Sequence, residues 1–265
     1  MKIGILYIAT GRYICFWKEF YESAKKFLFK NHDVRFFVLT DSAEIEYENS
    51  NDVIKIFAQA SKWPISVCDK YATILSAYKH YQDMDYVYYF NANMRFVAPV
   101  GDEILPKEEN NWLAICEWAN YIHRDDIENF PYERNEKSTA YIPLNEGKHY
   151  FMGGLHGGRV EQYTNMCKEL DYNTRLDFAK GIIAKVHDES HVNKYFLDKN
   201  PLIITPNYAM PERWKIKGYT KNIKCLVLKK HHYKYGGHAY LRGLTDKKIT
   251  PLKYWLNKLF NLKLQ

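Results

Sequence analysis

The strongest constraint on the fold of this chain is the alternation of strand-like and helix-like segments over its first 90 residues. Four runs of β-branched and aromatic residues have the character of buried strands: residues 2–10, 33–41, 52–60 and 85–90. Two segments with apolar residues at helical spacing lie among them: residues 13–30 and 68–84. This alternation predicts an α/β fold with a mostly parallel sheet. Ligands of such sheets bind beyond the carboxyl ends of the strands, so we expect a site there.

Composition narrows the class of protein. The 265 residues are 46% hydrophobic and 16% aromatic, which excludes a disordered chain and allows a large core. No apolar run approaches the roughly 20 residues that cross a bilayer, and the first residues have the character of a strand instead of a signal peptide. The five cysteines form no CxxC pair, which indicates reduced thiols. We therefore expect a cytoplasmic protein of one continuous domain with two lobes.

The net charge of +7 predicts an anionic partner, and basic residues concentrate after Lys194. One group could cradle phosphates: Lys229, Lys230, His231, His232, Lys234 and Arg242. The Gly236–Gly237 pair would let this segment fold over a ligand as a lid. A solvated basic face is the ordinary alternative. No nucleic-acid-binding motif accompanies the charge, so we expect no nucleic-acid partner.

The C-terminal segment 252–264 is both basic and amphipathic. It could lie on a membrane surface as a peripheral contact. Packing against the rest of the domain is the more ordinary arrangement.

The densest polar cluster is "VHDESHVNKYF". Asp188 or Ser190 could cap a helix there. His187 and His191 stand four residues apart, as zinc ligands do on a helix, but Asp188 replaces the glutamate that zincins place directly after the first histidine. In a third interpretation, Glu189 faces an anomeric carbon as a nucleophile or a stabilising charge, and Asp188 holds sugar hydroxyls.

Two glycine pairs, Gly153–Gly154 and Gly157–Gly158, lie in a loop-rich middle segment before a helix that begins near Val160. The first pair predicts either a tight turn with positive φ or a close approach of the backbone to a ligand.

The strand at 85–90 ends in Asn91-Ala92-Asn93. Acidic side chains at such a polar–x–polar step often hold a metal ion, but both side chains here are neutral amides. Amides bring no charge to offset the dehydration of a hard cation such as Mn²⁺ or Mg²⁺. They can still hydrogen-bond ribose or phosphate oxygens directly.

Several stretches occur together in the order found in one family: "YIATGRY", "KWPISVCDKYA", "DYVYYFNANMRFVAPVGDEIL", "FPYERNEKSTAYIPLNEGKHYFMGGLHGGRV", "HDESHVNKYF" and "LVLKKHH". In this combination the chain resembles glycosyltransferase family 6, the retaining α1,3-galactosyl- and N-acetylgalactosaminyltransferases that include the histo-blood-group A and B enzymes. The resemblance spans about residues 2–240. It implies a GT-A-like fold with a Rossmann-like nucleotide-binding sheet and an acceptor-binding lobe.

The resemblance also implies a division of labour along a single catalytic domain over 1–265. The nucleotide-sugar-binding half covers about 1–100, the acceptor and catalytic half about 101–245, and the basic tail 246–265. Donor-binding roles are implied for Ile8, Ala9, Thr10 and Tyr13 at uracil and ribose, Lys70 and Asp188 beside the donor, Met152, Gly153 and Gly154 at the sugar, and Lys229 at the diphosphate. Glu189 is implied as the catalytic carboxylate, and acceptor-binding roles fall to His156, His187 and Glu212.

The Asp-x-Asp metal motif of the family falls on Asn91-Ala92-Asn93, so we expect these residues to contact the donor directly. The charge that develops on the leaving UDP would then be met by cationic side chains: Lys229, Lys230 and Arg242. We therefore expect catalysis without a metal ion or another cofactor.

By this resemblance we expect transfer of GalNAc, in preference to galactose, from UDP to the 3-hydroxyl of a galactoside, by analogy a fucosylated H-type glycan. Gly154 leaves room for an N-acetyl group, whereas Met152 is the galactose-type residue. Front-face transfer and double displacement both stay open. So do two other functions, a UDP-sugar hydrolase at the same site and a sugar- or nucleotide-binding protein without turnover. Similarity to the short bacterial branch favours the cytoplasm, with peripheral contact to the inner membrane face through the basic tail.

Overall fold

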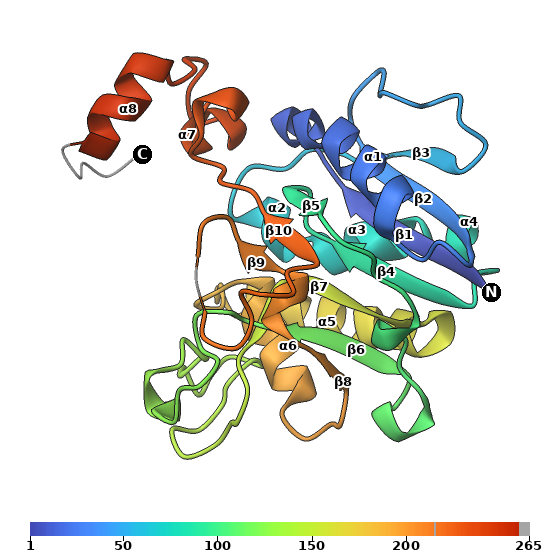
Figure 1. Cartoon of the computed structure of the whole chain (residues 1–265). Coiled ribbons are helices and arrows are strands. Elements are labelled where there is room, and N and C mark those ends of the chain that lie inside the picture. Colours follow the sequence, from blue (N-terminus) through green and yellow to red (C-terminus); the bar gives the residue numbers. More distant parts are fainter. Residues whose placement is uncertain (215, 260–265) are drawn as a thin grey trace.

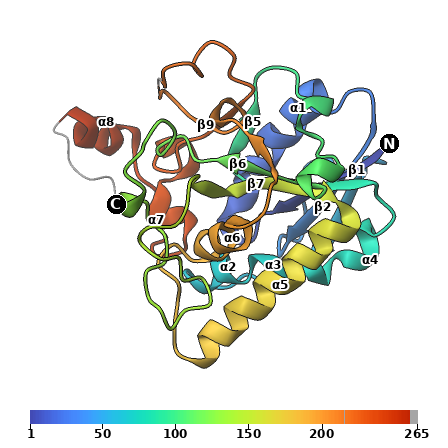
Figure 2. The ribbon, with the colours of Figure 1, turned by 90° about the horizontal axis from the view of Figure 1, so that it is seen from below.

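The computed structural model, which describes residues 1–214 and 216–259, is built on a seven-stranded sheet with helices on both faces (Figures 1 and 2). The strand order is β3-β2-β1-β4-β7-β6-β8. Strand β7 runs antiparallel to β4 and β6, and the other neighbouring pairs in this sheet are parallel. The predicted α/β class with a mostly parallel sheet is confirmed.

The strands of the large sheet have the following bounds: β1 Lys2–Ile8, β2 Asp33–Thr40, β3 Val53–Phe57, β4 Tyr86–Phe90, β6 Leu113–Glu117, β7 Phe151–Arg159 and β8 Leu202–Ile204. A second, three-stranded sheet has the order β5-β10-β9, with β5 Met94–Phe96, β9 Met210–Pro211 and β10 Cys225–Val227. The helices are α1 Trp17–Phe27, α2 Ile65–Cys68, α3 Lys70–Ser76, α4 Tyr78–Tyr81, α5 Val160–Ala179, α6 Asp188–Phe196, α7 His238–Leu241 and α8 Pro251–Leu259.

Strand β1 shows why the large sheet is buried on both faces. Ile3, Ile5 and Tyr7 are fully buried in the core that α1 and the small sheet cover. Leu6 points to the other face and belongs to the core that α3, α5 and α6 cover. Parallel strands covered on both faces need continuous apolar sequence, which is the pattern that β1 has.

The middle of the chain differs from the expectation. Residues 151–159 form the buried strand β7 where a loop was predicted. A Cβ atom at Gly157 would lie 2.3 Å from the Tyr88 ring, and one at Gly158 would lie 2.3 Å from the carbonyl oxygen of Trp112. Neither Gly153 nor Gly154 has a positive φ, so the tight-turn interpretation of that pair is wrong. These glycines let neighbouring side chains and backbone approach the strand closely.

The small sheet brings a distant part of the chain over the carboxyl ends of β1 and β4. Strand β10 pairs with β5 and β9, and the chain then passes to α7 and α8 at the edge of the molecule (Figure 1). The amide N–H of Leu228 donates to the carbonyl oxygen of Asn93 at 2.7 Å. This bond fixes the start of residues 228–231, called the lysine segment below, beside the end of β4.

Candidate active site

A cavity of about 920 Å³ lies beyond the carboxyl ends of β1 and β4, where the alternation of strands and helices predicts a ligand site. Its walls come from the turn after β1, the Asn91–Asn93 step, the first half of β7, the start of α6 and the lysine segment. Residues 238 and 241–243 from α7 and its end close another side.

Strand β7 is irregular where it meets this cavity. Ile115 of β6 pairs with His156 of β7, and the next pair is Glu117 with Phe151. One residue of β6 therefore separates the two pairs, but four residues of β7 do. Extra residues on one strand bend it and re-aim its side chains. Residues 152–155 of β7 stand opposite the single β6 residue Cys116, and three of them, 152–154, line the cavity.

The Glu189 carboxylate is held by one hydrogen bond on each oxygen. The Tyr150 hydroxyl donates to Oε1 at 2.8 Å, and the backbone N–H of Gly153 donates to Oε2 at 2.9 Å. Burial raises the pKa of Glu189 to about 7, because the low-dielectric surroundings penalise the charged form more than these bonds favour it. This carboxylate is therefore fixed in position at the cavity wall with an unusually high pKa.

Asp188 is occupied by a partner of its own. The Lys70 ammonium forms a buried ion pair with Asp188 and donates to the carbonyl oxygen of Gly153 at 2.5 Å. A Cβ atom on Gly153 would lie 2.6 Å from Asp188 Oδ2, so only glycine leaves room for this pair. At Gly154 a Cβ atom would lie 2.4 Å from Asn91 Nδ2. Both glycines thus admit polar side chains against the strand.

Asn193 fastens α6 to β7. Its Oδ1 accepts from the backbone N–H of Phe151 at 2.9 Å, and its Nδ2 donates to the carbonyl oxygens of Phe151 and Glu189, each at 2.8 Å. The side chain is 3% exposed, so these bonds do not compete with water. Through them the first turn of α6 keeps its place against the strand.

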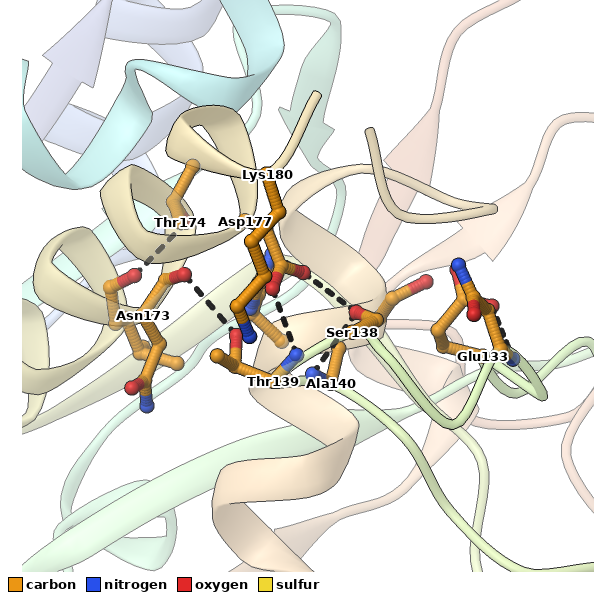
Figure 3. Close-up of polar contacts among 12 residues, drawn as sticks. Glu133, Ser138, Thr139, Ala140, Asn173, Thr174, Asp177 and Lys180 are labelled. Atoms are coloured by element: carbon orange, nitrogen blue, oxygen red, sulfur yellow. Dashed lines mark hydrogen bonds and ion pairs between the residues drawn. The ribbon is translucent and has the colours of Figure 1, made fainter. Parts of the chain in front are cut away.

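The stretch "YERNEKSTAYIP" does not line the cavity. Polar contacts, several of which are drawn in Figure 3, join it to α5 and to the segment before α6. Buried Asp177 near the end of α5 accepts from the Ser138 hydroxyl and from the backbone N–H of Thr139, the latter at 2.7 Å. Buried Glu133 accepts from the backbone N–H of Lys185 at 2.6 Å, just before α6. The polar contacts of this stretch are therefore structural, because they anchor the segment that leads into α6.

The two amides after β4 are already hydrogen-bonded within the protein. Asn93 is 2% exposed, and its Nδ2 donates to the carbonyl oxygen of Leu228 at 2.7 Å. Asn91 Oδ1 accepts from the Tyr89 hydroxyl at 3.1 Å. In the described part of the chain, no three His, Cys, Asp or Glu side chains gather as ligands for a metal ion. Both amides are neutral, and Oδ1 of Asn91 already accepts a hydrogen bond, so they are a poor ligand set for Mn²⁺ or Mg²⁺.

Cations gather on the part of the cavity wall that the lysine segment and the end of α7 form. The Lys230 ammonium lies 5.3 Å from the centre of the Tyr13 ring, and the Arg242 guanidinium lies 4.8 Å from that of Trp63. Burial first, and then the neighbouring cations, lower the pKa of Lys230 to about 8. Among the described residues, no ion pair joins Lys229, Lys230 or Arg242 to a carboxylate. This wall has the electrostatics of a site for an anionic ligand.

Comparison with known proteins identifies the family to which this site belongs. Residues 1–235 match the description "Glycosyltransferase family 6". The chain belongs to this family. Its relatives include the O-antigen biosynthesis glycosyltransferase WbnI of Escherichia coli, which is 27% identical over 238 residues that cover 90% of this chain and 99% of the relative.

Animal members of family 6 are similar over a comparable length. The histo-blood group ABO system transferase 1 of Rattus norvegicus is 29% identical over 241 residues, 87% of this chain and 67% of the relative. The globoside alpha-1,3-N-acetylgalactosaminyltransferase 1 of Gallus gallus is 29% identical over 221 residues, 80% of this chain and 63% of the relative. This chain is therefore a glycosyltransferase with a nucleotide-sugar donor and a glycan acceptor.

Most of the predicted site residues of this family 6 glycosyltransferase line the cavity of about 920 Å³. They are Ile8, Thr10, Tyr13, Lys70, Asn91, Ala92, Asn93, Met152, Gly153, Gly154, Asp188, Glu189, Glu212, Lys229, Lys230 and Arg242.

Three predicted residues lie elsewhere. Ala9 is fully buried, and its backbone N–H donates to the carbonyl oxygen of Leu39 at 2.9 Å. The predicted direct contact of Ala9 with uracil is therefore wrong, and the residue supports the turn after β1 instead. His156 is also fully buried and accepts or donates a 3.0 Å bond with the Tyr163 hydroxyl, which corrects its predicted acceptor contact. His187 is half-buried outside the cavity lining, with its ring 5.4 Å from that of Trp63.

Sequence reasoning missed several residues that build this site. Trp118 and Trp214 line the cavity with stacked rings 6.3 Å apart, although they are 96 positions apart in the sequence. Tyr150 and Asn193 hold Glu189 and α6, as described above. Spacing offers no signal for contacts between such distant positions. For Asn193 a signal existed, because a polar residue one turn after Glu189 shares its helical face.

Proposed function

We propose that this enzyme transfers GalNAc, in preference to galactose, from UDP to the 3-hydroxyl of a galactoside with retention of the α configuration and without a divalent ion. The observation that carries the proposal is the presence of a carboxylate wall and a cationic wall in one cavity. Glu189 is fixed by two hydrogen bonds on one wall. Lys229, Lys230 and Arg242 stand on the other, with no carboxylate of the described residues paired to them.

The cationic wall is the proposed place of the diphosphate. A departing UDP gains negative charge, and fixed cations in a site with little water stabilise it at the moment of bond cleavage. Two or three charge-assisted contacts of about 1.5–3 kcal/mol each could replace much of what a metal ion supplies. Ile8, Thr10 and Tyr13 line the neighbouring part of the cavity and are proposed to hold uracil and ribose.

The anomeric carbon would then face Glu189. In double displacement the Glu189 carboxylate attacks this carbon while the bond to UDP breaks. The acceptor 3-hydroxyl later displaces the carboxylate and loses its proton to a phosphate oxygen of UDP. In front-face transfer the same carboxylate stabilises the oxocarbenium-like charge while the acceptor attacks. Both forms require ionised Glu189. Because burial raises its pKa to about 7, the charged form is favoured most when a positive centre develops beside it.

Selection of the donor sugar is proposed to rest on the bulged part of β7. The space over Gly154 holds Asn91 and the end of the flexible Met152 side chain, so we propose that an N-acetyl group at the sugar 2-position reaches the strand there when Met152 moves aside. The Met152 side chain, 4% exposed, bounds the same region and sets its depth. Their combination favours UDP-GalNAc while still admitting UDP-galactose.

The acceptor is proposed to enter on the side of Trp118, Trp214 and Glu212. Flat aromatic rings cover the apolar faces of galactose units, and a carboxylate can accept hydrogen bonds from their hydroxyls. The relative from Escherichia coli is named for O-antigen biosynthesis. We accordingly propose a bacterial surface glycan or its precursor, fucosylated and of H type, as the acceptor.

The test is a panel of UDP-sugars with galactoside acceptors, run in EDTA. We expect transfer from UDP-GalNAc at a higher kcat/KM than from UDP-galactose, and faster loss of donor with acceptor than without. Strict dependence on Mn²⁺ contradicts the metal-free part of the proposal. Donor hydrolysis at the same rate with and without every acceptor would identify a hydrolase, and tight UDP-sugar binding without any turnover would identify a binding protein.

A further inference from the structure

Helix α8 turns an apolar face away from the protein. Four side chains at positions i, i+3, i+4 and i+7 share this face: Leu252, Trp255, Leu256 and Leu259. They are between 43% and 74% exposed. The helix lies at the edge of the molecule in both views of the ribbon (Figures 1 and 2). Within residues 1–214 and 216–259, this face is therefore not buried against another element.

The opposite side of α8 faces the protein and is polar. Tyr254 is 3% exposed, and its ring lies 4.8 Å from that of His232 and 5.5 Å from that of Tyr233. Lys253 and Asn257 line a second cavity, of about 320 Å³, at the base of the helix. The helix is thus attached through its polar side, which leaves the apolar face outward. An ordinary surface helix shows the reverse orientation.

Charge is divided unequally along the chain. Of 38 Lys and Arg residues, 14 follow Glu212, but only one of 31 Asp and Glu residues does. Residues 213–265 therefore carry +13, and residues 1–212 carry −6. From 247 to 265 there are five lysines and no acidic residue. Part of this charge belongs to the proposed diphosphate site, but the lysines after 246 lie outside its lining.

We propose that α8 docks the enzyme on the surface of a bilayer that contains anionic lipids. The apolar face would enter the boundary between head groups and acyl chains, and lysines beside it would meet lipid phosphates. Lys258 borders this face, with its ammonium 4.7 Å from the centre of the Trp255 ring, and Lys253 borders the other side of it. Lysine stems can cover apolar surface while their charges reach the head groups.

The docking is peripheral. No described helix is long and apolar enough to cross a membrane. A second copy of the chain fits the same face less well, because a two-fold contact through α8 would bring the lysines of both copies together. This proposal concerns a surface outside the active-site cavity, and its test does not depend on the proposed reaction.

The first experiment is flotation of the full chain with phosphatidylcholine vesicles, with and without about one third phosphatidylglycerol. We expect binding to the anionic vesicles, weakening at high salt, and about tenfold or greater loss in the double variant Leu252→Glu, Leu256→Glu. The matched control is Phe57→Glu, Leu144→Glu, which charges two apolar side chains elsewhere that are 72% and 64% exposed, against 71% and 43% for Leu252 and Leu256. Circular dichroism of each variant checks that the fold is retained.

A second readout locates the contact. Lipids brominated on their acyl chains quench a tryptophan that enters the bilayer, so the quenching of the wild-type chain should disappear in Trp255→Phe. Equal flotation of the α8 variant and its control would overturn the proposal. So would light scattering that shows a dimer dissolved by the α8 substitutions, together with no flotation of the wild-type chain.

Discussion

The two charged walls of the active-site cavity are held in different ways. On the carboxylate wall every charged group is bonded: Asp188 pairs with Lys70, and Glu189 accepts from Tyr150 and Gly153. On the cationic wall, Lys230 contacts an aromatic ring but no carboxylate of the described residues. Burial moves both walls toward neutrality, since it raises the pKa of Glu189 to about 7 and lowers that of Lys230 to about 8.

The charges of the carboxylate wall are therefore satisfied within the protein, whereas those of the cationic wall are left for a ligand to satisfy. On the carboxylate wall, hydrogen bonds and an ion pair within the protein offset the free-energy cost of removing the carboxylates from water, and they also fix α6 on β7. The cationic wall keeps unsatisfied positive charge, which an arriving diphosphate can satisfy. Asn93 lies between the two walls. It occupies the position of the metal motif, and its Nδ2 donates to the carbonyl oxygen of Leu228 beside the cations.

The largest effect is expected from a substitution in the carboxylate wall. In Glu189→Gln the side chain keeps its size but loses its charge, so we expect kcat for transfer to fall by about 10³-fold or more. UDP binding, which we assign to the other wall, should change less than about threefold by calorimetry. Glu169→Gln, an exposed change on α5, is the control. Near-normal turnover of Glu189→Gln would remove this residue from the mechanism.

The next effect concerns the cationic wall. Lys230→Ala should weaken UDP binding by roughly 10- to 100-fold, since one charge-assisted contact is lost, whereas exposed Lys79→Ala should not. An anion beside Lys230 raises its lowered pKa, so at pH 8 the wild-type enzyme should take up a proton on binding UDP. Calorimetry in buffers of different ionisation enthalpy measures this uptake. No uptake at pH 8 would place the diphosphate away from Lys230.

A third prediction tests the residue between the walls. Asn93→Asp replaces the donor to the carbonyl oxygen of Leu228 with a second acceptor, so we expect a loss of about 1–3 kcal/mol in the free energy of unfolding. Activity should fall and should not be restored by Mn²⁺. Denaturant unfolding and a Mn²⁺ titration measure both, with exposed Asn165→Asp as the control. A fully active, Mn²⁺-stimulated variant would mean that the site needs only a carboxylate to hold a metal ion.

The smallest effect is on pH dependence. Ionised Glu189 is required, so kcat/KM should fall as the pH drops below about 7. Tyr150→Phe removes a hydrogen bond that lowers the pKa of Glu189, whereas the burial that raises this pKa stays. The acid limb should therefore move up by roughly half a pH unit to one unit. A limb that stays in place would assign it to another group.

Sequence alone predicts strands β1 to β4, and most of the site residues that it predicts lie in the cavity lining. The exceptions have physical causes. The strands β1, β2 and β4 are continuous apolar runs, which local pattern reveals. Strand β7 was missed because its four glycines are poor strand formers, and they are tolerated only where distant partners such as Tyr88 need the space. Motif resemblance placed His156 at the acceptor, but the strand turns its ring into the core between Tyr89 and Tyr163. Contacts between distant positions, such as Tyr150 with Glu189, have no local signature.

The most direct test of the central claim measures transfer from UDP-GalNAc in EDTA, for the wild-type enzyme and for the Lys229→Ala, Lys230→Ala double variant, before and after addition of Mn²⁺. We predict full wild-type activity in EDTA, no gain with Mn²⁺, and a loss of about 10²-fold or more in the double variant that Mn²⁺ does not repair. Wild-type activity that appears only after Mn²⁺ is added, with the double variant behaving alike, would contradict the claim that fixed cations stabilise the leaving nucleotide.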